Sequence, residues 1–270
     1  MEELYVFGTG NAQATRCYNT CFAIKDGDEF FMVDAGGGNG ILGILEKMNV
    51  DMAHIHHIFV THEHTDHISG LATYIKKYRT PILCTPGTAR QLQYRLAGIG
   101  LLLRPLSMGQ PVSWDDLEIT PLPTSHDCRE SAAFRVDTPD GSLGYLTDTG
   151  LVEEETRQGL LGTDLLVLES NHDVDMLLSG PYPYPLKRRV IGNEGHLSNA
   201  DAAVFAADSA RCGTRSIILA HLSAENNTPQ LALDTVGRAL ESAAYTGELS
   251  VAPRSEPGKI YVMEGAACRR

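Results

Sequence analysis

Short apolar runs separated by Gly, Pro and Asp recur along the chain and are the first guide to its structure. The runs are rich in β-branched and aromatic residues and are bounded by turn-forming residues, which is typical of β-strands. This pattern predicts strands at residues 30–34, 55–61, 81–85, 117–121, 143–147, 164–169, 216–220 and 259–263.

Between these runs, apolar residues recur with the spacing of one helix face. This spacing predicts helices at residues 40–48, 67–78, 88–97, 200–211 and 229–245. Two of them have clear starting signals, because Asn199 is a candidate N-cap and Pro229 stands at a first helical position. By contrast, we expect residues 179–199 to form an exposed loop, because the sequence Pro-Tyr-Pro-Tyr-Pro within it is unfavourable for a helix.

The mixture of strands and helices places the chain in the α/β class. The elements lack the regular strand–helix–strand alternation of a doubly wound fold, and the sequence shows no long linker, repeat or low-complexity tract. A chain of 270 residues with 43% hydrophobic residues can fill a substantial core. We therefore expect residues 1–270 to form a single domain.

The composition is acidic, with 22 Lys and Arg against 34 Asp and Glu and a formal net charge of -12. Because a negative surface repels phosphates at long range, a nucleic-acid partner would have to be held locally, by a metal site and a small basic patch. The chain starts without a basic segment followed by an apolar run, and it has no apolar stretch near the roughly 18 residues that a membrane span needs. We therefore expect a cytoplasmic protein without a membrane partner.

The six cysteines are scattered and form no C-x-x-C pair, so neither a disulfide framework nor a thiolate zinc site is indicated. They are Cys17, Cys21, Cys84, Cys128, Cys212 and Cys268.

The most informative stretch is Thr61-His62-Glu63-His64-Thr65-Asp66-His67, which lies between an apolar strand and an amphipathic helix. In the extended part, alternation directs His62 and His64 to the same side, while Asp66 and His67 stand at the helix start. Imidazole nitrogen and carboxylate oxygen suit zinc, iron or manganese. The stretch therefore predicts a metal site on a strand-to-helix turn.

This H-x-H-x-D-H motif after an apolar strand resembles the signature of the metallo-β-lactamase superfamily. Other landmarks of that superfamily follow in order: an Asp closing an early strand at Asp34, a lone His at His126, a bridging Asp at Asp148 and a final His at His221. The resemblance implies a four-layer αββα sandwich. It also implies that Asp34 orients the ligand turn from behind.

The same resemblance implies two divalent metal ions, with zinc the first expectation and manganese or iron as alternatives. One ion would take His62, His64 and His126, the other would take Asp66, His67 and His221, and Asp148 would bridge them. Open positions would remain for a bridging hydroxide, the nucleophile of a hydrolase. Asp66 is therefore expected among both the ligands and the catalytic groups.

The second half of the chain resembles the WalJ/YycJ family, a group of nucleic-acid phosphodiesterases with reported DNA exonuclease activity that is related to ribonuclease Z. The similarity lies in residues 140–150, 168–173, 180–189, 195–199 and 221–229. The opening at residues 8–12 departs from that family and looks more like ribonuclease Z. There is no room between Asp148 and His221 for a large β-CASP domain, and no tRNA-clamping arm is evident, so processing of structured tRNA is disfavoured.

The resemblance to ribonuclease Z also implies catalytic roles for Glu169 and His196. The imidazole would protonate the leaving oxygen or steady the phosphoryl oxygens, and the carboxylate would fix its tautomer. His172 is a candidate wall of the site, with structural hydrogen bonding as the alternative. The compact basic and aromatic cluster offers phosphate and base contacts, although such a cluster is often only a solvated face. Its candidate substrate-binding residues are Tyr184, Lys187, Arg188 and Arg189.

These observations favour a metal-dependent phosphodiesterase, namely a DNA exonuclease-like nuclease whose partner is nucleic acid. Both a monomer and a homodimer are compatible with the sequence. The alternative is a small-molecule hydrolase for a cyclic phosphodiester, thioester or lactone, which the acidic composition favours. A di-iron oxidoreductase is disfavoured because no flavin domain is appended, and a purely structural protein would leave the full ligand set without a purpose.

Overall fold

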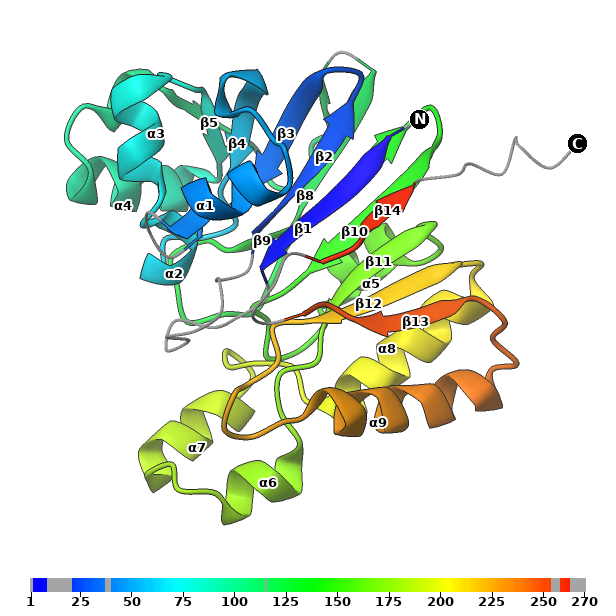
Figure 1. Cartoon of the computed structure of the whole chain (residues 1–270). Coiled ribbons are helices and arrows are strands. Elements are labelled where there is room, and N and C mark those ends of the chain that lie inside the picture. The colour runs from blue at the N-terminus through cyan, green and yellow to red at the C-terminus, as the bar shows by residue number, and fades with distance from the viewer. Residues whose placement is uncertain (1, 9–20, 37–39, 115, 254–257, 263–270) are drawn as a thin grey trace, which may run out of the picture. The chain divides into compact units, whose positions relative to one another are not determined.

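The computed structural model describes residues 2–8, 21–36, 40–114, 116–253 and 258–262 (Figure 1). The predictions made for Cys17, Cys268 and the opening at residues 9–12 lie outside this range. The chain divides into two compact units, each built on one seven-stranded sheet. The first unit comprises Met1–Gln110, Cys128–Ala132 and Pro253–Met263, and the second is mainly Pro111–Asp127 and Ala133–Ala252.

The sheet of the first unit runs in the order β14-β1-β2-β3-β4-β5-β6. Its strands are β1 (Glu3–Gly8), β2 (Cys21–Asp26), β3 (Glu29–Val33), β4 (Ile55–Phe59), β5 (Ile82–Cys84), β6 (Leu103–Pro105) and β14 (Ile260–Val262). Strands β14 to β3 pair antiparallel, and β3 to β6 pair parallel. The parallel half brings the carboxyl ends of β3 and β4 together, and these ends carry Asp34 and the His62 turn.

Helices connect the parallel strands of this unit and cover one face of its sheet. They are α1 (Gly40–Lys47), η1 (Met52–His54), α2 (Thr65–Ile68), α3 (Leu71–Lys77), α4 (Pro86–Arg95) and η2 (Ile99–Leu101). Leu45 of α1 and Tyr74 of α3 pack with Met32, Ile58 and Ile82 in one buried cluster. Burial of these large apolar side chains fixes the strand ends that bear the polar residues.

The helix predicted at residues 67–78 is divided into α2 and α3 at Gly70. A Cβ at Gly70 would lie 2.0 Å from the carbonyl oxygen of Ala35, so only glycine permits this approach. The Ala35 N–H donates to the carbonyl of His67 at 2.8 Å, and the Gly70 N–H donates to that of Gly36 at 3.1 Å. The break therefore holds the histidine turn against the Asp34 turn.

The sheet of the second unit runs in the order β13-β12-β11-β10-β9-β8-β7. Its strands are β7 (Val112–Trp114), β8 (Leu117–Pro123), β9 (Ala132–Thr138), β10 (Gly141–Leu146), β11 (Leu165–Glu169), β12 (Ser216–Ala220) and β13 (Glu248–Val251). Strands β10 to β13 are parallel. Their register pairs Glu169 with Ala220 and Leu146 with Leu168, which brings Asp148, Glu169 and His221 to one edge of the sheet. Carboxyl ends of parallel strands are the usual place for ligand sites in α/β folds.

The helices of the second unit are α5 (Glu154–Leu160), α6 (Val174–Ser179), α7 (Tyr184–Ile191), α8 (Asn199–Arg211) and α9 (Pro229–Ser242). Figure 1 shows α8 and α9 side by side along the sheet, and Phe205 of α8 and Val236 of α9 share a buried cluster with Leu168 of β11. The short helices α6 and α7 form a separate hairpin between β11 and α8 (Figure 1).

The prediction of an exposed loop at residues 179–199 is wrong, because helix α7 occupies the centre of this segment. Pro183 is the N-cap of α7, and Pro185 lies in its first turn, where no intrahelical N–H bond is required. The predicted position of the N-cap, Asn199, is also wrong by one residue. Ser198 caps α8, and its Oγ accepts a hydrogen bond from the Asp201 N–H at 3.1 Å. Pro229 does begin α9, after the N-cap Thr228.

All eight predicted strands are present, within one to two residues at most ends. The pattern missed six more, namely β1, β2, β6, β7, β9 and β13. Several of these are short or lie at sheet edges, where alternation is brief. No helix in the described part of the chain is both long and apolar enough to cross a membrane.

Candidate metal centre and catalytic groups

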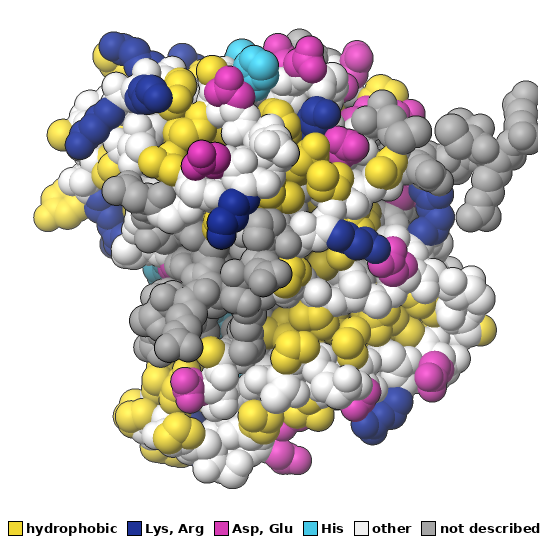
Figure 2. Space-filling model, in the orientation of Figure 1, with side chains coloured by type: hydrophobic (Ala, Val, Ile, Leu, Met, Phe, Trp, Pro, Cys, Tyr) yellow, Lys and Arg dark blue, Asp and Glu magenta, His cyan; other side chains and the backbone are white. Residues whose placement is uncertain are grey.

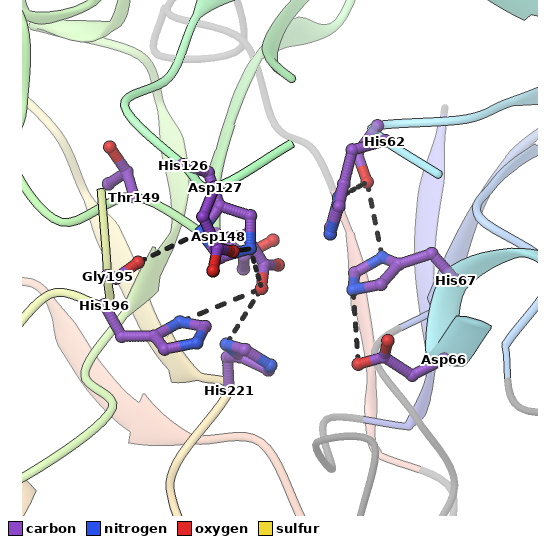
Figure 3. A network of polar contacts seen from close by, with 12 residues as sticks. His62, Asp66, His67, His126, Asp127, Asp148, Thr149, Gly195, His196 and His221 are labelled. Carbon is purple, nitrogen blue, oxygen red and sulfur yellow. Dashed lines mark hydrogen bonds and ion pairs between the residues drawn. The ribbon is translucent and has the colours of Figure 1, made fainter. Parts of the chain in front are cut away.

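In the first unit, the predicted ligands gather on the turn from β4 to α2 (Figure 3). The ring centroids of His62 and His64 lie 4.6 Å apart, and those of His62 and His67 lie 4.2 Å apart. His67 Nε2 lies 3.6 Å from Asp66 Oδ2. Glu63 takes another direction, since its carboxylate accepts from the Arg129 N–H at 3.0 Å. The turn thus groups three imidazoles and one carboxylate.

Asp34 holds this turn from behind. Its Oδ2 accepts from His67 Nδ1 at 2.7 Å, and its Oδ1 accepts from the Thr61 N–H at 2.9 Å. The Thr61 hydroxyl also lies 3.0 Å from His62 Nδ1. Because a carboxylate is the acceptor, His67 Nδ1 carries the proton and Nε2 carries the lone pair that a metal requires.

Burial raises the pKa of the Asp34 carboxyl, and the nearby charge of His67 and hydrogen bonds from His67 and Thr61 offset this only in part. The backbone of Asp34 is in the left-handed region, with φ 58°. Asp148 and His221 share this conformation, with φ of 58° and 57°. A non-glycine residue there costs conformational energy, and such residues concentrate at functional sites.

In the second unit, Asp148 lies among three imidazoles (Figure 3). Its Oδ1 is 3.5 Å from His221 Nδ1, 3.8 Å from His196 Nδ1 and 3.9 Å from His126 Nε2. The Nδ1 of His126 lies 3.0 Å from the carbonyl oxygen of Gly195, so it donates and leaves Nε2 with the lone pair. Asp148, His126 and His221 therefore lie close together in this unit.

Glu169 is the buried carboxylate that organises this group. Its Oε1 accepts from His196 Nδ1 at 2.8 Å and from His221 Nδ1 at 2.7 Å. Its Oε2 accepts from the Thr149 N–H at 2.9 Å, next to Asp148. One side chain thus holds a predicted ligand, the predicted proton donor and the turn of the predicted bridging residue.

The protonation of Glu169 follows from these contacts. Burial alone would raise the pKa of its carboxyl, but the charges and hydrogen bonds of His196 and His221 outweigh burial and lower that pKa to about 2. The carboxylate therefore stays ionised at neutral pH and accepts from both rings. Asp148, Glu169, His196 and His221 each offer one ligand atom, and these atoms lie within 4.8 Å of one another, so this group also has the composition of a metal-binding cluster.

The other predicted residues differ in their surroundings. The His196 side chain is 22% exposed, as a group that meets substrate must be. His172 is buried, with only 1% of its surface exposed, and burial lowers its pKa to about 4 although the nearby Glu169 carboxylate opposes this. Tyr184 and the three basic residues that follow it all lie on α7.

Three contributions to the site were not predicted from the sequence. The Thr61 hydroxyl, the Thr149 N–H and the Gly195 carbonyl each fix a side chain described above. The hydrogen bond between Glu169 and His221 was not predicted either, because the sequence suggested only a pairing of Glu169 with His196. Backbone groups carry no sequence signal, and threonine beside a ligand is too common to be informative.

Comparisons with known proteins agree with this geometry. A family model described as a β-lactamase superfamily domain matches residues 31–222. Exodeoxyribonuclease YycJ of Bacillus anthracis is 34% identical over 216 residues, which cover 79% of this chain and 82% of the relative. Exodeoxyribonuclease WalJ of Streptococcus pneumoniae serotype 2 (strain D39) is 32% identical over 226 residues, which cover 82% and 84%.

Among solved structures, the metallo-β-lactamase fold protein YhfI from Bacillus subtilis aligns with a TM-score of 0.72 over 96% of this chain and 98% of that one. Its sequence identity of 18% shows the fold alone. The chain belongs to the metallo-β-lactamase superfamily, has the fold of that superfamily and is a metal-dependent hydrolase.

Proposed function

We propose that this hydrolase is a dinuclear phosphodiesterase that acts as a DNA exonuclease. The observation that carries the proposal is the Glu169–His196 pair beside Asp148 and His221, because it adds a proton-transfer group to a set of metal ligands. The two relatives named exodeoxyribonuclease, each matched over about four fifths of both chains, support the choice of DNA.

We also propose that residues 1–270 act as one domain. His62, His64 and His126 would hold one ion, Asp66, His67 and His221 would hold a second, and Asp148 would be the ligand that they share. The donor set fits two such ions, because the rings of His67, His126 and His221 each present Nε2 while Nδ1 is held. Imidazole and carboxylate ligands suit Zn²⁺ first, with Mn²⁺ or iron as alternatives.

When bound, two divalent cations lower the pKa of a shared water and offset charge on the attacked phosphoryl group. The protein residues supply the remaining chemistry. His196 Nε2 donates a proton or hydrogen bond to the leaving or phosphoryl oxygen, and Glu169 holds the ring in place through Nδ1. The proposed substrate-binding group comprises Tyr184, Lys187, Arg188 and Arg189 of α7 together with the buried His172.

A second candidate function is hydrolysis of a small molecule, such as a cyclic phosphodiester, a thioester or a lactone. The net charge of -12 favours it, because the general surface repels a polyanion. The catalytic group described above would serve either substrate class.

A substrate panel distinguishes the two. The purified, metal-loaded protein is incubated with end-labelled single- and double-stranded DNA and RNA, with bis-p-nitrophenyl phosphate and with a thioester and a lactone. The proposal predicts stepwise shortening of DNA, inhibited by chelator. Turnover of thioester or lactone with intact DNA would instead establish the second function.

A further inference from the structure

The surface of the α6–α7 hairpin carries exposed hydrophobic side chains next to basic ones. Four of its large hydrophobic side chains are exposed, and Figure 2 shows hydrophobic side chains gathered over this region. They are Val174 at 37%, Leu178 at 56%, Tyr184 at 72% and Ile191 at 43% exposure. Basic side chains stand on the same helix α7, so the hairpin combines aromatic and cationic groups in a protein of negative net charge.

The three basic residues of α7 have different surroundings. Lys187 Nζ donates to the carbonyl of Leu178 at 2.6 Å and so ties α7 to the end of α6. Arg189 Nε is ion-paired with Asp127, the residue that follows His126. Arg188 has no side-chain hydrogen bond or ion pair with any residue that the structure describes. Of the three basic side chains, the Arg188 guanidinium is therefore the one available to bind a ligand.

Arg188 also lines an open hollow of about 500 Å³. The lining residues are Asp127, Arg188, Arg189, Gly192, Asn193 and Glu194. Asp127 is neutralised by Arg189, so the charges that remain are the Arg188 cation and the Glu194 carboxylate. An anion in this hollow would be attracted by the first and repelled by the second.

The loop that lines the hollow is hydrogen-bonded to the catalytic group. The loop after α7 continues to Gly195, whose carbonyl accepts from His126 Nδ1 at 3.0 Å. The same loop touches the turn after Asp148, because a Cβ at Gly150 would lie 2.2 Å from the Asn193 carbonyl oxygen. The hollow is thus held at a defined place beside two of the proposed metal ligands of the same unit.

Tyr184 and Arg188 are four residues apart on α7 and so lie on one face of the helix. An exposed aromatic ring stacks on a nucleic-acid base whatever its identity, and a neighbouring guanidinium binds a backbone phosphate. A duplex buries its base faces, so stacking on Tyr184 requires an unpaired base.

We propose that this face of α7 binds one nucleotide of a single strand, with its base on Tyr184 and its phosphate in the hollow on Arg188, and that Lys187 and Arg189 contribute to the substrate-binding group by holding the hollow in shape. The inference rests on the proposed nuclease function and names the substrate contact for it. It predicts that Glu194 opposes binding, which a simple basic patch does not.

The test is fluorescence anisotropy of a labelled single-stranded oligonucleotide with full-length, chelator-treated protein over a range of salt concentrations. Arg188→Ala should weaken binding and reduce the slope of log K against log salt by about 0.7, the value for one phosphate contact to a single strand. Tyr184→Leu should weaken binding about 5- to 150-fold with the slope unchanged, because stacking involves no counterion, and Tyr184→Phe should restore it.

Glu194→Gln should tighten binding. Arg238→Ala is the matched control, because Arg238 is an exposed arginine on α9 of the same unit and forms no ion pair with a residue that the structure describes, and it should change neither affinity nor slope. Melting temperatures verify that each variant is folded.

Equal losses for Arg188→Ala and Arg238→Ala, or weaker binding in Glu194→Gln, would overturn the subsite. Wild-type protein that binds no oligonucleotide would overturn it as well. DNA cleavage by the metal-loaded wild type distinguishes failure of the subsite from failure of the nuclease function. If the wild type cleaves DNA but Arg188→Ala leaves the salt slope unaltered, only the subsite is refuted. If the wild type does not cleave DNA, the nuclease function is refuted.

Discussion

Glu169 Oε1 lies 2.8 Å from Nδ1 of His196, and the same oxygen lies 2.7 Å from Nδ1 of His221. A single buried carboxylate thus orients a proposed metal ligand and a proposed proton donor. Asp34 has a corresponding place in the first unit, where it binds His67 Nδ1 at 2.7 Å. In each unit, one carboxylate fixes the tautomer of the histidine whose Nε2 is offered to metal.

The shared contact predicts that Glu169→Gln damages two functions together. Metal affinity should fall about 10- to 100-fold, because His221 loses the charge that orients it. Turnover under saturating metal should also fall, because His196 loses the same support. Chelator competition measures the first effect and steady-state kinetics the second. Unchanged metal affinity would show that the contact to His221 is incidental.

His196→Ala should separate these functions. His196 is outside the proposed ligand set, so metal content and fold should persist while turnover falls by about 10² to 10⁴. The loss should shrink for a diester whose leaving group is p-nitrophenolate, which departs without protonation. Turnover rates of His196→Ala on diesters with poor and with good leaving groups test whether His196 donates the proton. Equal losses on both would replace proton donation by a positional or oxyanion-binding role.

Asp148→Ala should lower bound metal and hydrolysis in parallel, because the two cations would lose the anion that offsets their repulsion. Metal analysis by mass spectrometry and assays of the same preparation provide the comparison. Two ions per chain with normal turnover in this variant would refute the bridging role.

His172 predicts a pH dependence of stability. Its pKa of about 4 lies below the ordinary histidine value of about 6.5, so between these pH values the unfolded chain binds a proton that the folded chain does not. The free energy of unfolding should therefore decrease as pH falls from about 6.5 to about 4. Denaturant unfolding of chelator-treated protein should show a weaker decrease for His172→Asn.

The matched control for that experiment is His56→Asn, which replaces an exposed histidine. It should retain the full pH dependence. If His172→Asn retains it as well, another group is responsible for the acid sensitivity.

The candidate site could be predicted from residue types that have few other uses in such a pattern. The H-x-H-x-D-H run and the residues after β10 and β12 were found because histidine and aspartate at strand ends stand out against apolar runs. The helix α7 was missed, since proline disfavours helix interiors and its tolerance in the first turn depends on where the helix starts. The double contact of Glu169 depends on the register of β11 against β12, which a single sequence does not encode locally.

The central claim is that two metal ions per chain support exonucleolytic cleavage of DNA. The most direct test is titration of the metal-free protein with Zn²⁺ or Mn²⁺ while release of nucleotides from end-labelled DNA is followed. The account predicts that activity rises with metal and reaches its plateau at two equivalents per chain, and that chelator abolishes it. DNA that stays intact at saturating metal, or full activity in the metal-free protein, would contradict it.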